Sequence, residues 1–419
     1  MQCVEGDLNS SAARLFEGFL RRTHLSRPSE LADVVAEEVE AALGASDVVL
    51  SLANHEQTAL VPVPSRRSTP REDQKIEGTF AGRAFSTMEL VTAPAAESGR
   101  RRVWLPMLDG TERMGTLELT VPSEGDTVAS ELVMILERYT HAVAQATLSK
   151  GLYGDVFERV RRSQPMTVGA ELLWSVLPPL TYATEGLVIS AMLEPAYDNG
   201  GDAFDYAVND THAHLAVFDA MGHGLAASGA AVLAVAAYRN TRRADHGLSE
   251  TYALMDAAIG EHFPDRFVTA VLAQLELDSG RLTWVNAGHP PPLLVRRARV
   301  VKRLEAPAAT PLGMLFERDD AVVGSEQLEQ GDVVLIYTDG LTEARQPGGA
   351  FLTEEGLTDF LRREATAELP TPEMLRRFRR ALLDRVGGVL RDDASAVLVH
   401  WRGGAEERLL PESVTSTFS

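Results

Sequence analysis

Four short blocks place aspartates where an apolar strand is expected to begin or end, with glycine or other small residues beside them. They are NGGDAFD at 199–205, VFDAMGHG at 217–224, VLIYTDGLTEA at 334–344 and RDDAS at 391–395. Glycine beside an aspartate lets the backbone turn tightly and approach a ligand closely. One aspartate after a strand is usually a turn residue or helix cap. Four such blocks in one region instead indicate a shared site.

Carboxylates gathered at one point raise each other's pKa unless a cation lies between them. The candidate ligands are Asp202, Asp219, Asp339 and one of Asp392 and Asp393. Oxygen donors of this kind suit Mg²⁺ or Mn²⁺, and a zinc site has little support without an HExxH pattern. Two such ions can activate a water and clamp a phosphoryl group. The residues therefore predict a hydrolase that acts on phosphate esters.

The elements that must position these residues follow Pro178–Pro179, where the chain becomes rich in strand patterns. We expect strands over 187–193, 214–218, 267–277, 281–287, 333–337 and 395–401, with a hairpin turn at 278–280. We expect helices over 225–242, 248–262, 354–363 and 372–386. Strands followed by helices favour packed sheets with helices outside them.

The N-terminal third alternates helix and strand patterns. A helix is expected over 31–43, strands over 47–52, 103–108 and 114–121, and a surface loop over 62–75. From Val128 onward, apolar residues recur at spacings of four and three, namely Leu132, Leu136, Tyr139, Val143 and Ala146. This heptad-like stripe fits a helix packed on its own domain, or a linker helix that pairs with its twin in a homodimer.

Composition narrows the class of protein. The chain has 419 residues, a net charge of −20 and one cysteine, Cys3. Two or three domains are expected from this length. A nucleic-acid partner is disfavoured, because no excess of basic residues could neutralise phosphates. The single cysteine fits a reducing cytoplasm, and no signal peptide is visible at the N-terminus. The longest nearly apolar stretch, 225–238, is too short to span a membrane.

Five ordered motifs resemble the metal-dependent (type 2C, PPM) protein phosphatases, and more narrowly the bacterial branch typified by stage II sporulation protein E. They are GGDAFD (200–205), DAMGHG (219–224), NAGHPPPLL (286–294), YTDGLTEA (337–344) and DDAS (392–395). The upstream AELLWSVLPP (170–179) resembles the helix that precedes the domain in that branch. The resemblance covers about 171–401 and implies an α/β/β/α sandwich with two divalent cations, Mn²⁺ or Mg²⁺, between the sheets.

The resemblance also assigns ligands. Asp219 would bridge both ions, and the Ala220 carbonyl and Asp202, mostly through water, would serve the first. Asp339 and an acid of the 392–393 pair would serve the second. Counting back from Ser395, Asp392 matches the family ligand better than Asp393.

Three further residues have open roles. His223 is a candidate general acid or an orienting residue. Asp205 is a candidate for a third metal or for a structural role, and His289 fits a structural loop. The arginine that binds phosphate in many eukaryotic members has no obvious counterpart, so the metals would carry most phosphate binding.

The N-terminal region resembles a GAF-type sensory domain, chiefly through GTFAGRAFSTMELV (78–91). We therefore expect an α+β GAF-like domain over 9–127, a helical linker over 128–180, the phosphatase domain over 181–403 and a disordered tail over 404–419. The sensory domain would take a small-molecule or protein input, and no residue in it names a ligand or cofactor.

The leading hypothesis is a protein serine/threonine phosphatase. By resemblance, its substrate would be a phosphorylated regulatory protein, an anti-sigma-factor antagonist of the STAS type. One alternative is a catalytically weak pseudophosphatase that acts as a ligand-sensing scaffold. A second is a two-metal hydrolase of small phosphate esters.

Overall fold

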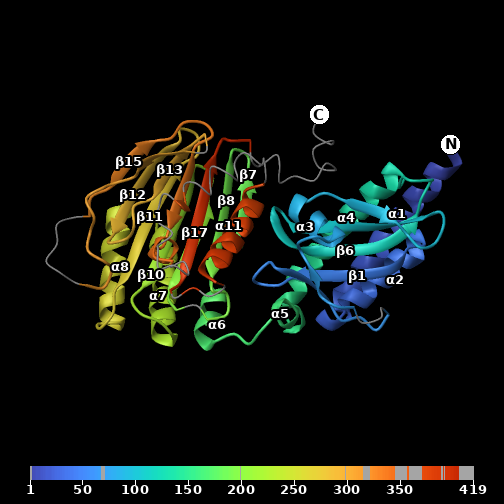
Figure 1. Cartoon of the computed structure of the whole chain (residues 1–419), viewed down its shortest axis with the longest axis horizontal. Helices are drawn as coiled ribbons and strands as arrows, with labels where there is room; N and C mark the ends of the chain where they lie inside the picture. Colours follow the sequence, from blue (N-terminus) through green and yellow to red (C-terminus); the bar gives the residue numbers. More distant parts are fainter. Residues whose placement is uncertain are drawn as a thin grey trace. The chain divides into compact units, whose positions relative to one another are not determined.

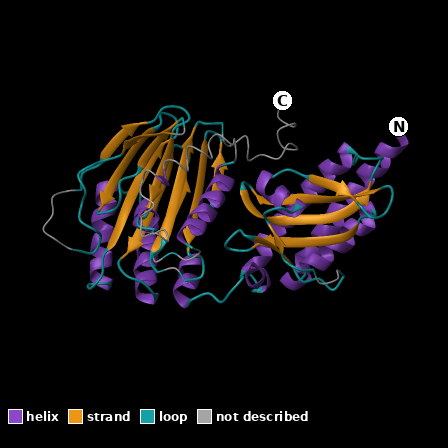
Figure 2. Cartoon of the chain, viewed as in Figure 1, coloured by secondary structure: helices purple, strands orange, loops and turns teal. Residues whose placement is uncertain are grey.

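The computed structural model describes residues 2–67, 71–198, 200–297, 299–314, 321–344, 356–357, 370–387, 390 and 392–404. The chain divides into two compact units, the first ending at Ser163 and the second running from Gln164 to Arg408. Figures 1 and 2 show each unit as sheet flanked by helices. Within the described residues, no helix is both long and apolar enough to cross a bilayer.

The first unit is built on one antiparallel sheet in the order β3-β2-β1-β6-β5-β4. Its strands are β1 (Ser46–Ala53), β2 (Ala59–Pro62), β3 (Gln74–Lys75), β4 (Val91–Pro94), β5 (Arg100–Asp109) and β6 (Glu112–Pro122). Its helices are α1 (Gln2–Leu25), η1 (Pro28–Glu30), α2 (Leu31–Leu43), α3 (Phe80–Thr87), α4 (Ser130–Gly151) and α5 (Val156–Arg161). The loop expected over 62–75 is shorter than predicted, because β3 pairs with β2 at its end.

The heptad-like stripe lies on α4 and faces the core of its own unit. Leu132, Leu136, Tyr139 and Val143 are buried there, and the Tyr139 hydroxyl donates to the Val35 carbonyl at 3.1 Å. Burial of these side chains selects the first interpretation of the stripe, a helix packed on its own domain.

The second unit contains two antiparallel sheets. The first sheet has the order β15-β12-β11-β10-β9 and the second sheet has the order β14-β13-β16-β17-β8-β7. The first comprises β9 (Asp202–Val208), β10 (His212–Ala220), β11 (Val268–Glu276), β12 (Arg281–Ala287) and β15 (Gly324–Gln327). The second comprises β7 (Thr181–Thr184), β8 (Leu187–Glu194), β13 (Leu293–Arg296), β14 (Arg299–Arg303), β16 (Val333–Tyr337) and β17 (Ala394–Trp401).

Helices cover the outer faces of both sheets, as Figure 2 shows. They are α6 (Val168–Trp174), α7 (Leu225–Arg243), α8 (Leu248–His262), α9 (Asp339–Thr342) and α11 (Thr371–Val386). One apolar core joins α7 and α8 to the first sheet, a second fills the space between the sheets, and a third joins α11 to the second sheet. This arrangement confirms the predicted α/β/β/α sandwich.

The alternating direction of the side chains along β10 explains why the side chain of an aspartate lies between the sheets. Ala216 and Phe218 lie in the core beneath the helices, whereas Leu215 and Val217 lie between the sheets. Because side chains alternate along a strand, Asp219 also points into the space between the sheets.

The predicted hairpin at 278–280 is present between β11 and β12. Gly280 has a φ of 73°, and a Cβ there would lie 2.2 Å from the Trp401 ring, so glycine is required. The helix expected over 354–363 lies almost wholly outside the described residues, as do Asn199, Arg391 and nearly all of the 404–419 tail.

Candidate metal centre

Asp202 and Asp219 face each other on neighbouring strands at one end of the sandwich. Asp202 opens β9, Asp219 lies near the end of β10, and the two are direct cross-strand partners. The Asp202 side chain is buried, with 1% of the residue exposed. Two carboxylates this close, in a space shielded from water, repel each other unless one is protonated or a cation lies between them.

The second sheet brings the other acids to the same end. Asp339 begins α9 directly after β16, and Asp392 and Asp393 directly precede β17. β16 and β17 are paired, with Tyr337 opposite Ala396. The two strand ends therefore lie side by side and deliver three acidic residues toward Asp219.

Burial and crowding raise the pKa values of several of these carboxylates. Burial raises the pKa of Asp219 to about 7, and the charges of Asp339, Asp392 and Asp393 add to the effect. The pKa of Asp202 lies well above its ordinary range because of burial, then because of Asp219 and Asp393. Burial also raises the pKa of Asp339, with Glu343 and Asp392 contributing. All five predicted acids are thus within electrostatic reach of a common region.

The donor chemistry of this region fits hard divalent cations. The convergent groups are carboxylates, and their mutual repulsion is what a bound cation would relieve. Within the described residues, no three acidic or histidine side chains already surround one point closely enough to form a complete cage.

Ala220 ends β10, and His223 lies in the turn that follows it. Gly201 packs directly against Ala220, because a Cβ on Gly201 would lie 2.7 Å from the Ala220 carbonyl oxygen. His223 is exposed, and its backbone lies over Gly200, where a Cβ would come within 3.2 Å of the His223 Cα. The structure thus brings both predicted residues to the rim of the acidic cluster.

Asp205 lies on β9 but belongs to a different set of contacts. Its Oδ1 accepts from Arg239 Nη2 at 2.6 Å, and its Oδ2 accepts from Arg242 Nη1 at 2.7 Å. Both arginines are on α7, on the helical side of the first sheet. With each oxygen engaged by a guanidinium, Asp205 fits the structural role and not that of a third-metal ligand.

His289 is also structural. It is buried, its Nδ1 lies 2.8 Å from the Thr269 hydroxyl, and its Nε2 lies 3.0 Å from the Tyr337 carbonyl. Because a carbonyl only accepts, Nε2 carries the proton and Nδ1 accepts from Thr269. Burial lowers the pKa of His289 to about 4, so the neutral ring joins the first sheet to the end of β16.

One residue of the cluster escaped the sequence reasoning. Thr338 is fully buried, and its hydroxyl donates to Asp202 Oδ2 at 2.7 Å. The only signal was its place in the YTDG motif, where a threonine before an aspartate resembles an ordinary turn residue.

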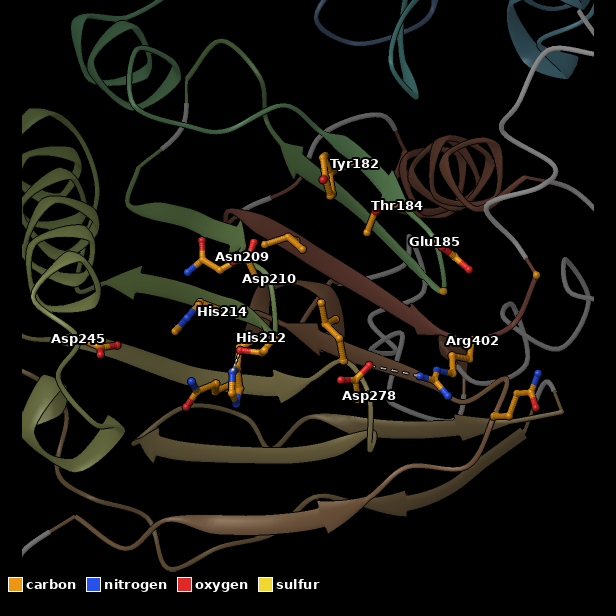
Figure 3. A pocket seen from close by; sticks show the side chains of 17 residues that line it. Tyr182, Thr184, Glu185, Asn209, Asp210, His212, His214, Asp245, Asp278 and Arg402 are labelled. Atoms are coloured by element: carbon orange, nitrogen blue, oxygen red, sulfur yellow. Dashed lines mark hydrogen bonds and ion pairs between the residues drawn. The ribbon is translucent and has the colours of Figure 1, made fainter. Parts of the chain in front are cut away.

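A polar groove of about 1520 Å³ opens at the opposite end of the sandwich (Figure 3). It takes Val208 from the end of β9 and His212 from the start of β10, whereas Asp202 and Asp219 lie at the other ends of these strands. Its lining also includes Asp278 and Arg402, which lie 3.8 Å apart. The groove is therefore separate from the acidic cluster.

The raised pKa values predict how the metal-free protein responds to pH. Folded Asp219 keeps its proton to about pH 7, against an ordinary value of 3.8, so between these values the folded state binds more protons than the unfolded state. Stability must then fall as pH rises through this window. We expect the melting temperature in EDTA to drop from pH 5 to pH 8, and Mn²⁺ to oppose the drop.

Other groups titrate in the same range, so the contribution of Asp219 requires a difference measurement. The Asp219→Asn variant should show a flatter dependence of melting temperature on pH than the wild type, both in EDTA. Equal slopes for the two proteins would contradict the assignment of a raised pKa to Asp219.

Residues 209–402 match the family model described as stage II sporulation protein E (SpoIIE). This match lies within the second unit and covers just under half of the chain, so the second unit is similar to that family.

Curated relatives are distant. Phosphoserine phosphatase RsbU of Bacillus subtilis is 22% identical over 272 residues, which cover 64% of this chain and 77% of RsbU. Protein IcfG of Synechocystis sp. is 25% identical over 135 residues, covering 32% of this chain and 20% of IcfG. Phosphoserine phosphatase RsbP of B. subtilis is 28% identical over 151 residues, covering 34% and 36%. The chain thus spans a fifth of IcfG and about a third of RsbP.

Solved structures show similarity of the same order. The RsbU and RsbW domains of Rv1364c from Mycobacterium tuberculosis share 28% identity and a TM-score of 0.46, covering 52% of this chain and 62% of that chain. The catalytic domain of the phosphatase PstP, solved with two manganese ions, shares 18% identity and a TM-score of 0.34, covering 51% and 98%.

Proposed function

We propose that the second unit is a metal-dependent protein serine/threonine phosphatase that hydrolyses phosphoserine or phosphothreonine on a regulatory protein. The observation that carries this proposal is the convergence of Asp202, Asp219, Asp339 and the 392–393 pair on one end of the sandwich. The SpoIIE match and the RsbU relative, itself described as a phosphoserine phosphatase, support the same reading.

We propose the following ligands for two divalent cations, Mn²⁺ or Mg²⁺. By the family resemblance Asp219 would contact both ions, and its burial among the charges of Asp339, Asp392 and Asp393 fits that role. The Ala220 carbonyl and Asp202 would serve one ion, and Asp339 and Asp392 the other. When bound, such ions supply a water that is deprotonated near neutral pH and neutralise charge on the phosphoryl group.

Residues of the chain would exclude water from the site and orient the substrate. Burial of Asp202 and of the facing strands excludes bulk water from the inner side, so electrostatic interactions there are stronger than in solution. His223, on the exposed rim, is placed to orient the substrate or to give a proton to the leaving serine oxygen. We favour the orienting role, because the ring stands in a solvent-exposed turn between two glycines with positive φ, Gly222 and Gly224.

We further propose that the substrate is a phosphorylated anti-sigma-factor antagonist of the STAS type, and that the first unit is a GAF-like sensory domain whose input sets the activity. The substrate proposal rests on the resemblance of the five motifs to the bacterial phosphatase branch. The sensory-domain proposal rests on the resemblance of residues 78–91 to GAF-type domains. A small phosphate ester as substrate, or a scaffold without catalysis, would be the alternatives.

A comparison of substrates tests the proposal. With Mn²⁺ present, a phosphoserine-bearing STAS-type protein should release phosphate with a kcat/KM far above that for free phosphoserine. Equal values for the two substrates would favour a small-ester hydrolase. Mn²⁺ binding without phosphate release from either would favour the scaffold.

A further inference from the structure

The turn from Gly200 to Asp202 is held from the opposite sheet at two points. This turn carries the first acid of the cluster into β9, yet its contacts come from residues at the ends of β16 and β17. These contacts join the two sheets at the end of the sandwich that carries the acidic cluster. Charged groups replace the apolar core there.

Asp393 makes the first contact. Its Oδ2 accepts from the Gly200 N–H at 2.6 Å and from the Gly201 N–H at 2.7 Å, and it lies 3.4 Å from the Asp202 nitrogen. A Cβ on Gly200 would come within 3.0 Å of the same oxygen, so glycine permits the approach. Both lone pairs of Oδ2 are thereby engaged by backbone N–H groups, so this oxygen is not available to a cation.

The main chain of Asp393 is fixed as well. A Cβ on Gly340 would lie 1.7 Å from the Asp393 carbonyl oxygen, so the glycine after Asp339 lets these two segments touch. Asp392, by contrast, is exposed, and its charge acts on both Asp219 and Asp339. The two adjacent acids therefore have different surroundings and different roles.

Thr338 makes the second contact. Its hydroxyl donates to Asp202 Oδ2 at 2.7 Å and accepts from the Ser395 N–H at 2.8 Å. The Thr338 N–H in turn donates to the Ser395 carbonyl at 3.1 Å. With its proton and a lone pair both engaged, the hydroxyl cannot rotate freely, and it fixes the orientation of the Asp202 carboxylate.

We propose that Thr338 and Asp393 are positioning residues for the Gly200–Asp202 turn, and that Asp393 is not a metal ligand. Asp393 holds the backbone of the turn, and Thr338 holds the carboxylate that the turn presents. The inference rests on the proposed phosphatase function for its kinetic consequences, whereas its consequences for metal binding stand independently.

The pair Asp392→Asn and Asp393→Asn tests the assignment. Asparagine keeps an oxygen that can accept from Gly200 and Gly201 but is a poor ligand for a hard cation. By calorimetric titration with Mn²⁺, Asp393→Asn should keep the wild-type stoichiometry, with affinity changed by less than about tenfold. Asp392→Asn should lose one ion or weaken it by roughly 100-fold. Asp278→Asn, in the distant groove, is the matched control and should bind as the wild type does.

Thr338→Val and Thr338→Ser test the second contact. Valine keeps the shape but removes the hydroxyl, so kcat on a phosphoserine protein should fall roughly 10–100-fold, as for other groups that orient metal ligands, with KM little changed. Serine restores the hydroxyl and should recover most of kcat. Melting temperatures of both variants separate this effect from unfolding.

Two results would overturn the inference. One is loss of a Mn²⁺ ion in Asp393→Asn as severe as in Asp392→Asn. The other is a kcat for folded Thr338→Val equal to that of the wild type. If the wild type binds Mn²⁺ but releases no phosphate, the proposed function fails while the binding comparison still decides the role of Asp393.

Discussion

Replacing Asp219 with asparagine is expected to lower Mn²⁺-dependent kcat by about 10³-fold, or about 4 kcal/mol in activation free energy. Asp219 faces Asp202 across the strand pair and feels the charges of Asp339, Asp392 and Asp393. Its carboxylate is therefore influenced by acids from both sheets. Loss of its charge should therefore weaken both proposed ions together, not one alone.

The measurement is phosphate release from a phosphoserine protein across a range of Mn²⁺ concentrations. Excess Mn²⁺ should not restore the variant, because the missing group is the one shared by the two ions. Asp278→Asn serves as control, since its side chain lies in the groove at the opposite end of the sandwich. Equal activity of Asp219→Asn and wild type would remove Asp219 from the centre of the site.

Replacing Asp205 with alanine should have the largest effect on stability. The change leaves Arg239 and Arg242 without the carboxylate that engages both, and breaking a buried ion pair in this way costs about 3 kcal/mol or more. The side chain of Arg242 is 9% exposed, so water replaces the lost partner poorly. We expect a decrease of roughly 6–12 °C in melting temperature.

Metal binding separates this structural role from the third-metal alternative. Below its melting temperature, Asp205→Ala should bind as many Mn²⁺ ions as the wild type, with similar affinity. A protein of unchanged stability that has lost one ion would contradict the structural role and restore Asp205 as a ligand. Asp210→Ala is a suitable control, since Asp210 is exposed in the turn between β9 and β10.

The acidic cluster could be anticipated because its signals are local in sequence. An apolar strand that ends in an aspartate and a glycine, as at Asp339, is readable from one segment alone. Alternation along β10 places Asp219 on the same face as Leu215 and Val217, and the packing of the two sheets is needed to show that this face lies between them. The resemblance of these ordered blocks to the type 2C phosphatases then implied the sandwich.

The hydrogen bonds that hold the acidic cluster in place could not be predicted, because they join segments that lie far apart in the sequence. Thr338 looks like a turn residue until Asp202 is placed beside it by the opposite sheet. Likewise, the sequence separates Asp392 from Asp393 only by their spacing from Ser395, whereas the structure shows Asp393 bound to the Gly200 and Gly201 N–H groups. The stripe on α4 was ambiguous for a related reason, since apolar spacing does not reveal which surface covers it.

The most direct test of the central claim is a titration of the metal-stripped full-length protein with Mn²⁺, followed by calorimetry and by phosphate release from a phosphoserine protein in the same samples. We predict that two Mn²⁺ ions bind per chain and that phosphate release appears as the second site fills. Hydrolysis that persists in the stripped protein, or a chain that binds no Mn²⁺ at all, would contradict it.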